Sequence, residues 1–171
     1  RPIPLGIIKP DEALGLGITL SILSVVLLGL ASNLLSSLLL ASSILFYIFV
    51  YTIWLKRKTC QNIVIGGAAG ALPPLIGWVS VANEISFFPV MLFLIIFIWT
   101  PPHFWALSLY SDNDYEKAGI PMLPNILGKK VTKKSIVKYS YFLYFFCILP
   151  YLGGFSGKFY LLAALILNTY F

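Results

Sequence analysis

Charged residues are scarce in this sequence. Asp, Glu, Lys and Arg make up 11% of its 171 residues, whereas ordinary soluble domains carry about 25%. Hydrophobic residues reach 59%, and the mean hydropathy is +0.91. A soluble fold of this length has too little interior to bury so much apolar surface. A soluble globular domain is therefore excluded, and an all-α membrane protein is indicated.

Cysteine is also rare. Cys60 lies beside a basic stretch and Cys147 within an apolar run, a pattern that indicates neither a disulfide framework nor a zinc site. The sequence has no long linker or low-complexity tract, which favours a single domain. It begins at Arg1 without a Met or a signal-type segment and ends inside an apolar run. We therefore expect residues 1–171 to be one transmembrane domain that is cut at both ends.

Long uncharged runs predict the membrane spans. Residues 13–55 carry no charge, and as one helix they would reach about 65 Å, roughly twice the hydrocarbon thickness of a bilayer. This run must therefore turn once, and Ala31-Ser32-Asn33 is the natural place. We expect a polytopic helical bundle of about six spans, the last too short to cross, at residues 13–30, 34–55, 63–82, 87–109, 136–152 and 159–171.

The basic residues gather on one side of the expected membrane. Of the 12, only Lys158 falls on the other side. The rest are Arg1, Lys9, Lys56, Arg57, Lys58, Lys117, Lys129, Lys130, Lys133, Lys134 and Lys138. Short loops rich in Lys and Arg stay in the cytosol. We therefore expect an integral, multi-pass protein of the bacterial inner (plasma) membrane, or alternatively of the mitochondrial inner membrane, with basic loops on the cytosolic or matrix face. The net charge of +6 then reflects topology and not nucleic-acid binding.

Acidic residues gather on the same side, at the inner end of the fourth span. Asp112, Asp114 and Glu116 follow one another closely there. If the helix continues, Asp112 and Glu116 share a face. Carboxylates gathered at a membrane boundary suit Mg²⁺, which takes one or two carboxylates together with substrate phosphates. A solvated helix end with ordinary loop charge is the alternative.

A second candidate cluster follows the second span, where Tyr51 precedes the cations Lys56, Arg57 and Lys58. These cations suit a diphosphate, and the aromatic residues suit the wall of an apolar channel. Basic anchors beside an aromatic belt show the same pattern in ordinary membrane proteins.

His103 is the only histidine, and it lies inside a span. Ionisable residues at such depth are functional candidates, yet Pro101 and Pro102 each free a carbonyl that His103 can satisfy instead. In the third span, Gly66 and Gly70 form a small-residue face that favours close helix packing. Two spans broken by Pro-Pro pairs are also typical of a small-solute transporter with discontinuous helices.

Taken together, these segments resemble one family. They are RPIP at 1–4, YTIWLKRKT at 51–59, QNIVIGGAAGALPPLIGW at 61–78, WTPPHFWAL at 99–107, DY at 114–115 and KAGIPMLP at 117–124. In order and content they are similar to the protohaem IX farnesyltransferases (haem O synthases) of the UbiA superfamily of intramembrane prenyltransferases. The resemblance covers residues 1 to about 128 closely and the final two spans only by hydropathy.

The resemblance implies a bundle of nine spans when complete, around a cavity that opens toward the basic face. It implies transfer of the farnesyl group of farnesyl diphosphate to a vinyl group of haem b, giving haem O for haem–copper oxidases. Mg²⁺ is the implied cofactor and haem b a substrate. The implied partners are the lipid bilayer and, as candidates, haem A synthase or oxidase assembly factors.

Carried onto this sequence, the resemblance assigns roles to eight residues. Asp112 and Asp114 are expected to be catalytic and to hold the metal, Lys56 and Arg57 to act on the diphosphate, and Tyr51, Asn62, His103 (toward haem) and, more weakly, Glu116 to bind substrate. In the superfamily pattern two carboxylates stand four residues apart. In this sequence the residue four positions after Asp112 is Glu116, so two different pairs of carboxylates can hold the metal. The first Asp-containing motif would lie before Arg1. The rival readings are another prenyltransferase with an aromatic or quinone-precursor acceptor, the transporter, and a structural or assembly subunit of a haem enzyme.

Overall fold

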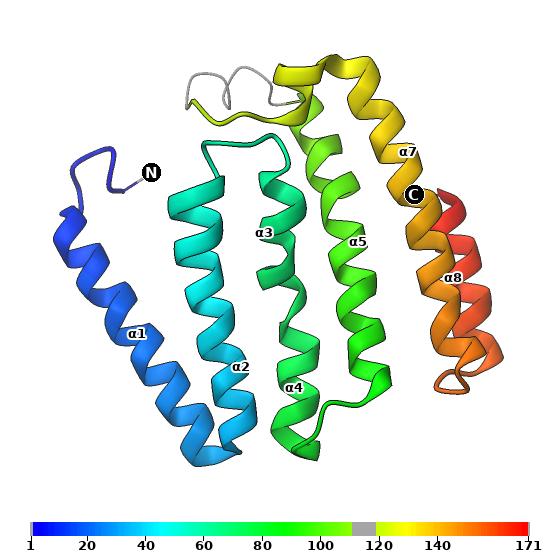
Figure 1. Ribbon diagram of the computed structural model, residues 1–171, viewed down its shortest axis with the longest axis horizontal. Helices are drawn as coiled ribbons and strands as arrows, with labels where there is room; N and C mark the ends of the chain where they lie inside the picture. Colours follow the sequence, from blue (N-terminus) through cyan, green and yellow to red (C-terminus); the bar gives the residue numbers. More distant parts are fainter. Residues whose placement is uncertain (1, 111–118, 171) are drawn as a thin grey trace.

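The computed structural model describes residues 2–110 and 119–170, which fold almost entirely as helices joined by short loops (Figure 1). The expected all-α class is confirmed, since the described residues contain no strand. The elements are α1 (Pro10–Ala31), α2 (Leu34–Leu45), the π-helix η1 (Phe46–Leu55), α3 (Asn62–Ala71), α4 (Pro73–Ala82), α5 (Phe87–Tyr110), α7 (Leu123–Leu152) and α8 (Lys158–Tyr170).

Five helical rods are long and apolar enough to cross a membrane within the described part of the chain. They are Pro10–Ala31, Leu34–Leu55, Asn62–Ala82, Phe87–Tyr110 and Leu123–Leu152. They correspond to the first five expected spans. The sixth, α8, has 13 residues, short of the roughly 20 that a spanning helix needs.

The turn expected at residues 31–33 separates α1 from α2. Asn33 caps α2, because its side-chain oxygen accepts a hydrogen bond from the Ser36 amide at 2.8 Å. Its Nδ2 atom also donates to the Val79 carbonyl at 2.7 Å, near the end of α4. The turn is therefore both capped and tied to a neighbouring span.

The two Pro-Pro pairs act differently. Pro73 begins α4 directly after Leu72, where the third span is divided. Pro101 and Pro102 instead lie inside α5, which continues without interruption from Phe87 to Tyr110. The expectation of two broken spans is therefore wrong for α5. Both of these prolines are buried, and packing against neighbouring helices holds a proline-containing span together.

The fifth span begins earlier than expected, at Leu123 instead of residue 136. Gly128 bends the rod with φ 80° and ψ 161°, values that an L side chain rarely adopts. The lysines between residues 129 and 138, expected in a loop, are helical. Lysine is a good helix former, and its long stem lets the ammonium group reach water from a helix that enters the membrane.

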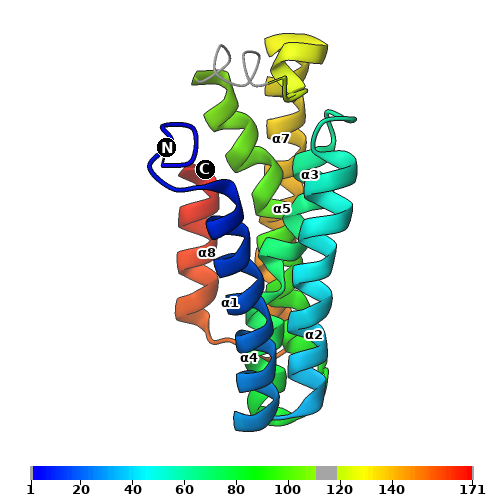
Figure 2. The same cartoon turned by 90° about the vertical axis from the view of Figure 1, so that its left-hand side faces the viewer.

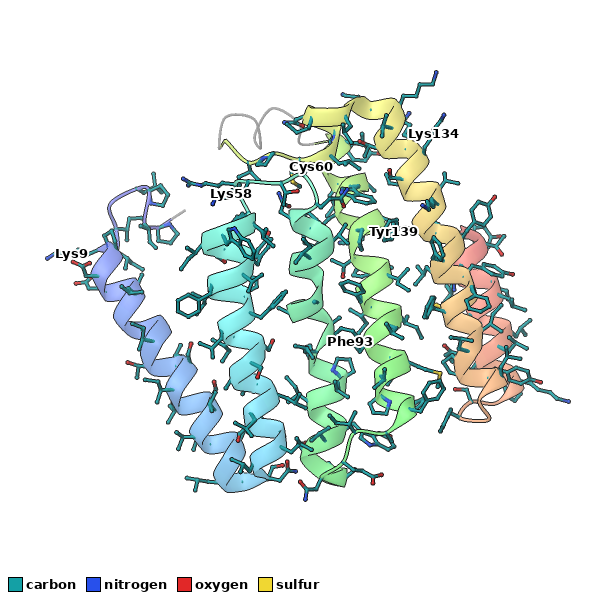
Figure 3. The ribbon with its side chains drawn as sticks, viewed as in Figure 1. Lys9, Lys58, Cys60, Phe93, Lys134 and Tyr139 are labelled. Carbon is teal, nitrogen blue, oxygen red and sulfur yellow. The ribbon has the colours of Figure 1, made fainter. Side chains whose placement is uncertain are left out.

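The helices form a curved layer with α1 at one end and α7 with α8 at the other, and α1 and α8 lie toward the same side in the turned view (Figures 1 and 2). The loops before α1, between η1 and α3, and before α7 all lie at one end of the bundle. Lys9, Lys58 and Lys134 mark this end in Figure 3. We call it the basic end. These basic segments thus lie at one end of the bundle, while the side of the membrane that this end faces stays a prediction.

Candidate functional site

An aromatic pocket lies between η1, α3 and α5. Its volume is about 310 Å³, and it is lined by Tyr47, Tyr51, Ile63, Gly66, Gly67, Gly70, Ile96, Trp99, Thr100 and Phe104. Apart from the tyrosine and threonine hydroxyls and the indole N–H of Trp99, the lining side chains are apolar. Pockets of this kind, mostly apolar with few polar groups, are the usual form of a site for an organic ligand.

Glycines of α3 let the neighbouring helices approach closely. A Cβ atom added to Gly66 would lie 2.6 Å from Cε2 and 2.9 Å from Cγ of Tyr51, so the Tyr51 ring occupies the space that a side chain would need. Gly67 receives Thr100 of α5 in the same way, with Cγ2 at 3.0 Å from the position of a Cβ. The packing role predicted for Gly66 is confirmed. At Gly70, the other predicted member of this face, an added Cβ atom would meet no atom within 4 Å, and Gly70 lines the pocket instead.

The π-helical turn places a cation beside the pocket wall. In η1 the Lys56 amide donates to the Tyr51 carbonyl at 2.8 Å, and the Thr52 hydroxyl donates to the Tyr47 carbonyl at 2.9 Å. The Lys56 ammonium nitrogen lies 5.9 Å from the centre of the Tyr51 ring, within the range of a cation–π contact. The tyrosine rings pack together with centroids 5.2 Å apart. The structure thus brings together two of the predicted residues, Tyr51 and Lys56, while Arg57 is exposed in the loop beyond them.

Asn62 ties the basic end together. It is completely buried. Its Nδ2 atom donates to the carbonyls of Thr59 at 2.8 Å, Lys56 at 3.2 Å and Pro121 at 3.2 Å. The first two carbonyls belong to the basic segment, and the third to the stretch just before α7. Its side-chain oxygen is buried without a partner among the described residues. Asn62 therefore fixes the backbone of two loops that carry predicted site residues.

His103 packs on an aromatic neighbour. Its ring stacks on Trp99 with centroids 4.2 Å apart and planes 18° apart, and Phe104 meets it edge-on at 5.5 Å. Trp99 and Phe104 both line the pocket. Within the described residues, no hydrogen bond joins His103 to a carbonyl freed by Pro101 or Pro102. The described structure therefore does not show the carbonyl contact, and it does not test the ligand contact.

Asp112, Asp114 and Glu116 lie outside the described residues. The chain enters their segment from Tyr110 at the end of α5 and leaves it at Gly119, and both points lie at the basic end (Figure 1). Among the described residues alone, no three His, Cys, Asp or Glu side chains gather as a metal site would need. The chemistry of the predicted donor set fits Mg²⁺, because carboxylate oxygens are hard ligands.

The family model described as the UbiA prenyltransferase family matches residues 1–171. The chain belongs to the UbiA prenyltransferase family. The resemblance drawn from the motifs is thereby confirmed at the level of the family. No solved structure matches the chain significantly.

Several curated relatives of this UbiA-family chain carry one name. A protoheme IX farnesyltransferase of Acidiphilium cryptum is 54% identical over 171 residues, which are 100% of this chain and 54% of that protein. One of Brucella anthropi is 58% identical over 160 residues, covering 94% of this chain and 51% of that protein. One of Granulibacter bethesdensis is 52% identical over 171 residues, covering 100% and 54%. The chain spans about half the length of these relatives.

Sequence reasoning missed part of the pocket in this UbiA-family chain. Tyr47, Trp99, Thr100 and Phe104 line it but were not selected as site residues. Tyr47 stands four residues before Tyr51, and Trp99 and Thr100 stand four and three residues before His103. Helical spacing from the selected residues is the signal that would have found these three, whereas Phe104, directly after His103, has no such signal.

Proposed function

We propose that this chain is part of a protohaem IX farnesyltransferase that joins farnesyl diphosphate to a vinyl group of haem b and so makes haem O. The observation that carries the proposal is its 52–58% identity, over nearly the whole chain, to proteins named for this activity. The compared stretch covers the segments that build the aromatic pocket and the basic end. The geometry supports the same chemistry, since cationic side chains stand beside an apolar pocket.

The basic end suits the diphosphate. Lys56 leans over the Tyr51 ring at the pocket wall, and Arg57 is exposed one residue further on. An ammonium and a guanidinium group stabilise the negative charge that grows on a departing diphosphate. When bound by Asp112 and Asp114, Mg²⁺ would supply further positive charge to the diphosphate oxygens. The buried amide of Asn62 donates hydrogen bonds to the carbonyls of Lys56 and Pro121. These bonds hold the basic segment beside the stretch that leads into α7.

The reaction makes one carbon–carbon bond. The bond between the first farnesyl carbon and the diphosphate oxygen breaks, and the diphosphate leaves with the electron pair. The terminal vinyl carbon of haem b bonds to the farnesyl carbon, and water adds to the neighbouring vinyl carbon with loss of a proton. Aromatic faces such as those of Tyr47 and Tyr51 stabilise positive charge on the allylic group, and an apolar pocket keeps bulk water from capturing it early.

His103 is the proposed contact for haem b. Its ring and that of Trp99 form a stacked pair beside the pocket. A flat aromatic pair offers a surface on which a planar tetrapyrrole can pack. With no hydrogen bond to a proline-freed carbonyl in the described residues, the imidazole remains available to a ligand.

The chain is an integral membrane protein, since its described residues include five apolar helices of spanning length. We propose that it lies in a bacterial plasma membrane, because the relatives compared are bacterial. We propose further that the basic end faces the cytosol, because segments rich in Lys and Arg beside membrane spans stay on that side. Haem A synthase or an oxidase assembly factor is the proposed recipient of the product.

The proposal is tested by expressing the complete protein in a bacterium that lacks its own haem O synthase. Haem extracts are then analysed by mass. Appearance of haem O, identified by the added hydroxyethylfarnesyl group, is expected. A prenylated benzoate formed from added 4-hydroxybenzoate, with no haem O, would instead assign an aromatic acceptor.

A further inference from the structure

The three cations at the end of η1 differ in their surroundings. Lys56 is half-buried, and its ammonium nitrogen lies 5.9 Å from the centre of the Tyr51 ring, which lines the aromatic pocket. Arg57 and Lys58 are exposed. The three side chains are consecutive in sequence, so the backbone of η1 decides which of them stands at the pocket wall.

The π-helical register of η1 selects Lys56. In an α-helix each residue turns by about 100°, so a residue five positions after Tyr51 would point about 140° away from it. Leu55, four positions on, would then be the neighbour of Tyr51 on the same face. In η1 the Lys56 amide instead donates to the Tyr51 carbonyl at 2.8 Å, which is the five-residue bond of a π-helix. The register therefore gives Tyr51 a cation as its neighbour in place of an apolar side chain.

A π-helix of this length needs support from its surroundings. The form is rare and occurs mostly as single turns inside α-helices, whereas η1 has 10 residues. Its sequence, FYIFVYTIWL, favours an α-helix only weakly, because Leu55 alone is a strong helix former. The Tyr51 ring lies where a side chain of Gly66 would stand, which fixes one side of η1 against α3.

Thr52 supplies a second support, from its side chain to the backbone. Its hydroxyl donates to the Tyr47 carbonyl, five residues back, at 2.9 Å. Four other threonine hydroxyls in the described residues donate to a carbonyl only four residues back, those of Thr19, Thr100, Thr132 and Thr169. The Thr52 bond therefore matches the π register and would lose its partner in the α register.

From these observations we infer that Thr52 is a positioning residue for Lys56. Its hydroxyl bond to the Tyr47 carbonyl holds η1 in the π register, and this register places the Lys56 ammonium group at the pocket wall. Thr52 does not line the pocket and acts through the cation alone. The inference rests on the proposed function for the identity of the ligand, the diphosphate of the isoprenoid donor. Without the bond, η1 shifts toward the α register and Lys56 turns away from the pocket.

The first test removes the hydroxyl in the complete enzyme. Thr52→Val keeps the shape of the side chain, and Thr52→Ser keeps the hydroxyl. Thr19→Val is the matched control, because Thr19 is also exposed and its hydroxyl donates to the Gly15 carbonyl at 2.8 Å within α1. The KM is measured for farnesyl diphosphate and for haem b.

We expect Thr52→Val to raise the KM for farnesyl diphosphate about three- to tenfold, as for the loss of one hydrogen bond. The KM for haem b should stay nearly the same. Thr52→Ser and Thr19→Val should keep both values close to those of the original enzyme. An unchanged KM for farnesyl diphosphate in Thr52→Val, or an equal rise for both substrates, overturns the inference.

The second test is a double-mutant cycle that measures equilibrium binding and not turnover. Affinity for farnesyl diphosphate is determined for Thr52→Val, for Lys56→Gln and for the double variant. If Thr52 acts through Lys56, Thr52→Val should weaken binding in the original protein and have little further effect once the cation is absent. The same loss in both backgrounds would mean that the hydroxyl supports only the fold, and it overturns the inference.

The binding cycle also separates this inference from the proposed function. Farnesyl diphosphate binds in this assay without an acceptor. A coupled cycle in a protein that prenylates an aromatic compound would therefore support the role of Thr52 and reject haem b as the acceptor. Formation of haem O together with an additive cycle would leave the proposed function in place and reject the role of Thr52.

Discussion

The Nδ2 atom of Asn62 donates a hydrogen bond to the carbonyl oxygen of Pro121, 3.2 Å away and 59 residues further along the chain. The same atom holds the carbonyls of Lys56 and Thr59. One buried amide therefore joins the basic segment after η1 to the stretch that leads into α7. The predicted carboxylates Asp112 and Asp114 precede that stretch in sequence, so this contact sets the position of one end of their segment.

Replacing Asn62 tests this joint. Asn62→Ala removes a donor to three carbonyls, and each buried group left unpaired costs about 1–3 kcal/mol. We expect turnover to fall at least tenfold and the KM for farnesyl diphosphate to rise. Asn33→Ala is the control, because Asn33 ties two elements at the opposite end of the bundle. It should lower thermal stability in detergent while the KM stays unchanged. Equal effects on the KM would remove the special role of Asn62.

Gly66→Ala tests the contact between α3 and η1. The new methyl group would lie 2.6 Å from Cε2 of Tyr51, so the ring must move out of its place. Overpacking of this kind costs about 1–3 kcal/mol, and the displaced ring carries the Lys56 contact with it. We expect lower stability and lower turnover, with Gly77→Ala close to the original protein. Stability should return in part when Gly66→Ala is combined with Tyr51→Ala, and the absence of any return would contradict the proposed clash.

His103→Ala separates a haem contact from a structural role. If His103 binds haem b, the variant should lose affinity for haem b severalfold while affinity for farnesyl diphosphate stays nearly the same. Absorption titration with haem b and competition binding with farnesyl diphosphate measure the two. A parallel loss of both affinities, accompanied by lower thermal stability, would indicate that His103 only supports the packing of α5.

The orientation in the membrane is tested at Cys60. This residue lies in the loop at the basic end, whereas Cys147 lies within α7. A membrane-impermeant thiol reagent should label Cys60 in inside-out vesicles and not in right-side-out vesicles. Cys147→Ser should not change either result. Labelling only in right-side-out vesicles would place the basic end outside the cell and contradict the proposed topology.

The carboxylates are tested in the complete protein. Asp112→Asn or Asp114→Asn should abolish Mg²⁺-dependent turnover while membrane insertion remains normal, because the amide keeps the size but removes the charge that holds the metal. Neutralising Lys129 and Lys130 together is the comparison. These residues lie on α7, and their loss should affect turnover much less. Similar losses in both cases would mean that the overall charge at the basic end matters and not the acidic pair.

Features with a local cause were predictable from the sequence. The turn at Asn33 follows from a polar interruption in a run too long for one span, and the start of α4 follows from Pro73. The gathering of the basic segments at one end follows from span count and charge. Each depends on composition over a few residues, which hydropathy reports well.

Features that depend on packing were not predictable. The continuity of α5 through Pro101 and Pro102 depends on the neighbours that bury them. Hydropathy cannot separate a lysine-rich helix from a loop, so the early start of α7 was missed. The difference between Gly66 and Gly70 arises from what stands opposite each one, a tyrosine ring in one case and an open pocket in the other.

Farnesyl transfer to haem b is tested most directly by competition in the purified, complete enzyme. Haem b and 4-hydroxybenzoate are offered together in equal amounts with farnesyl diphosphate and Mg²⁺, and both products are quantified by mass. We expect haem O to form with loss of diphosphate, and Lys56→Gln to reduce its rate at least tenfold through the lost positive charge beside the leaving group. Prenylated benzoate without haem O, or haem O at the same rate in Lys56→Gln, would contradict the proposed reaction at this site.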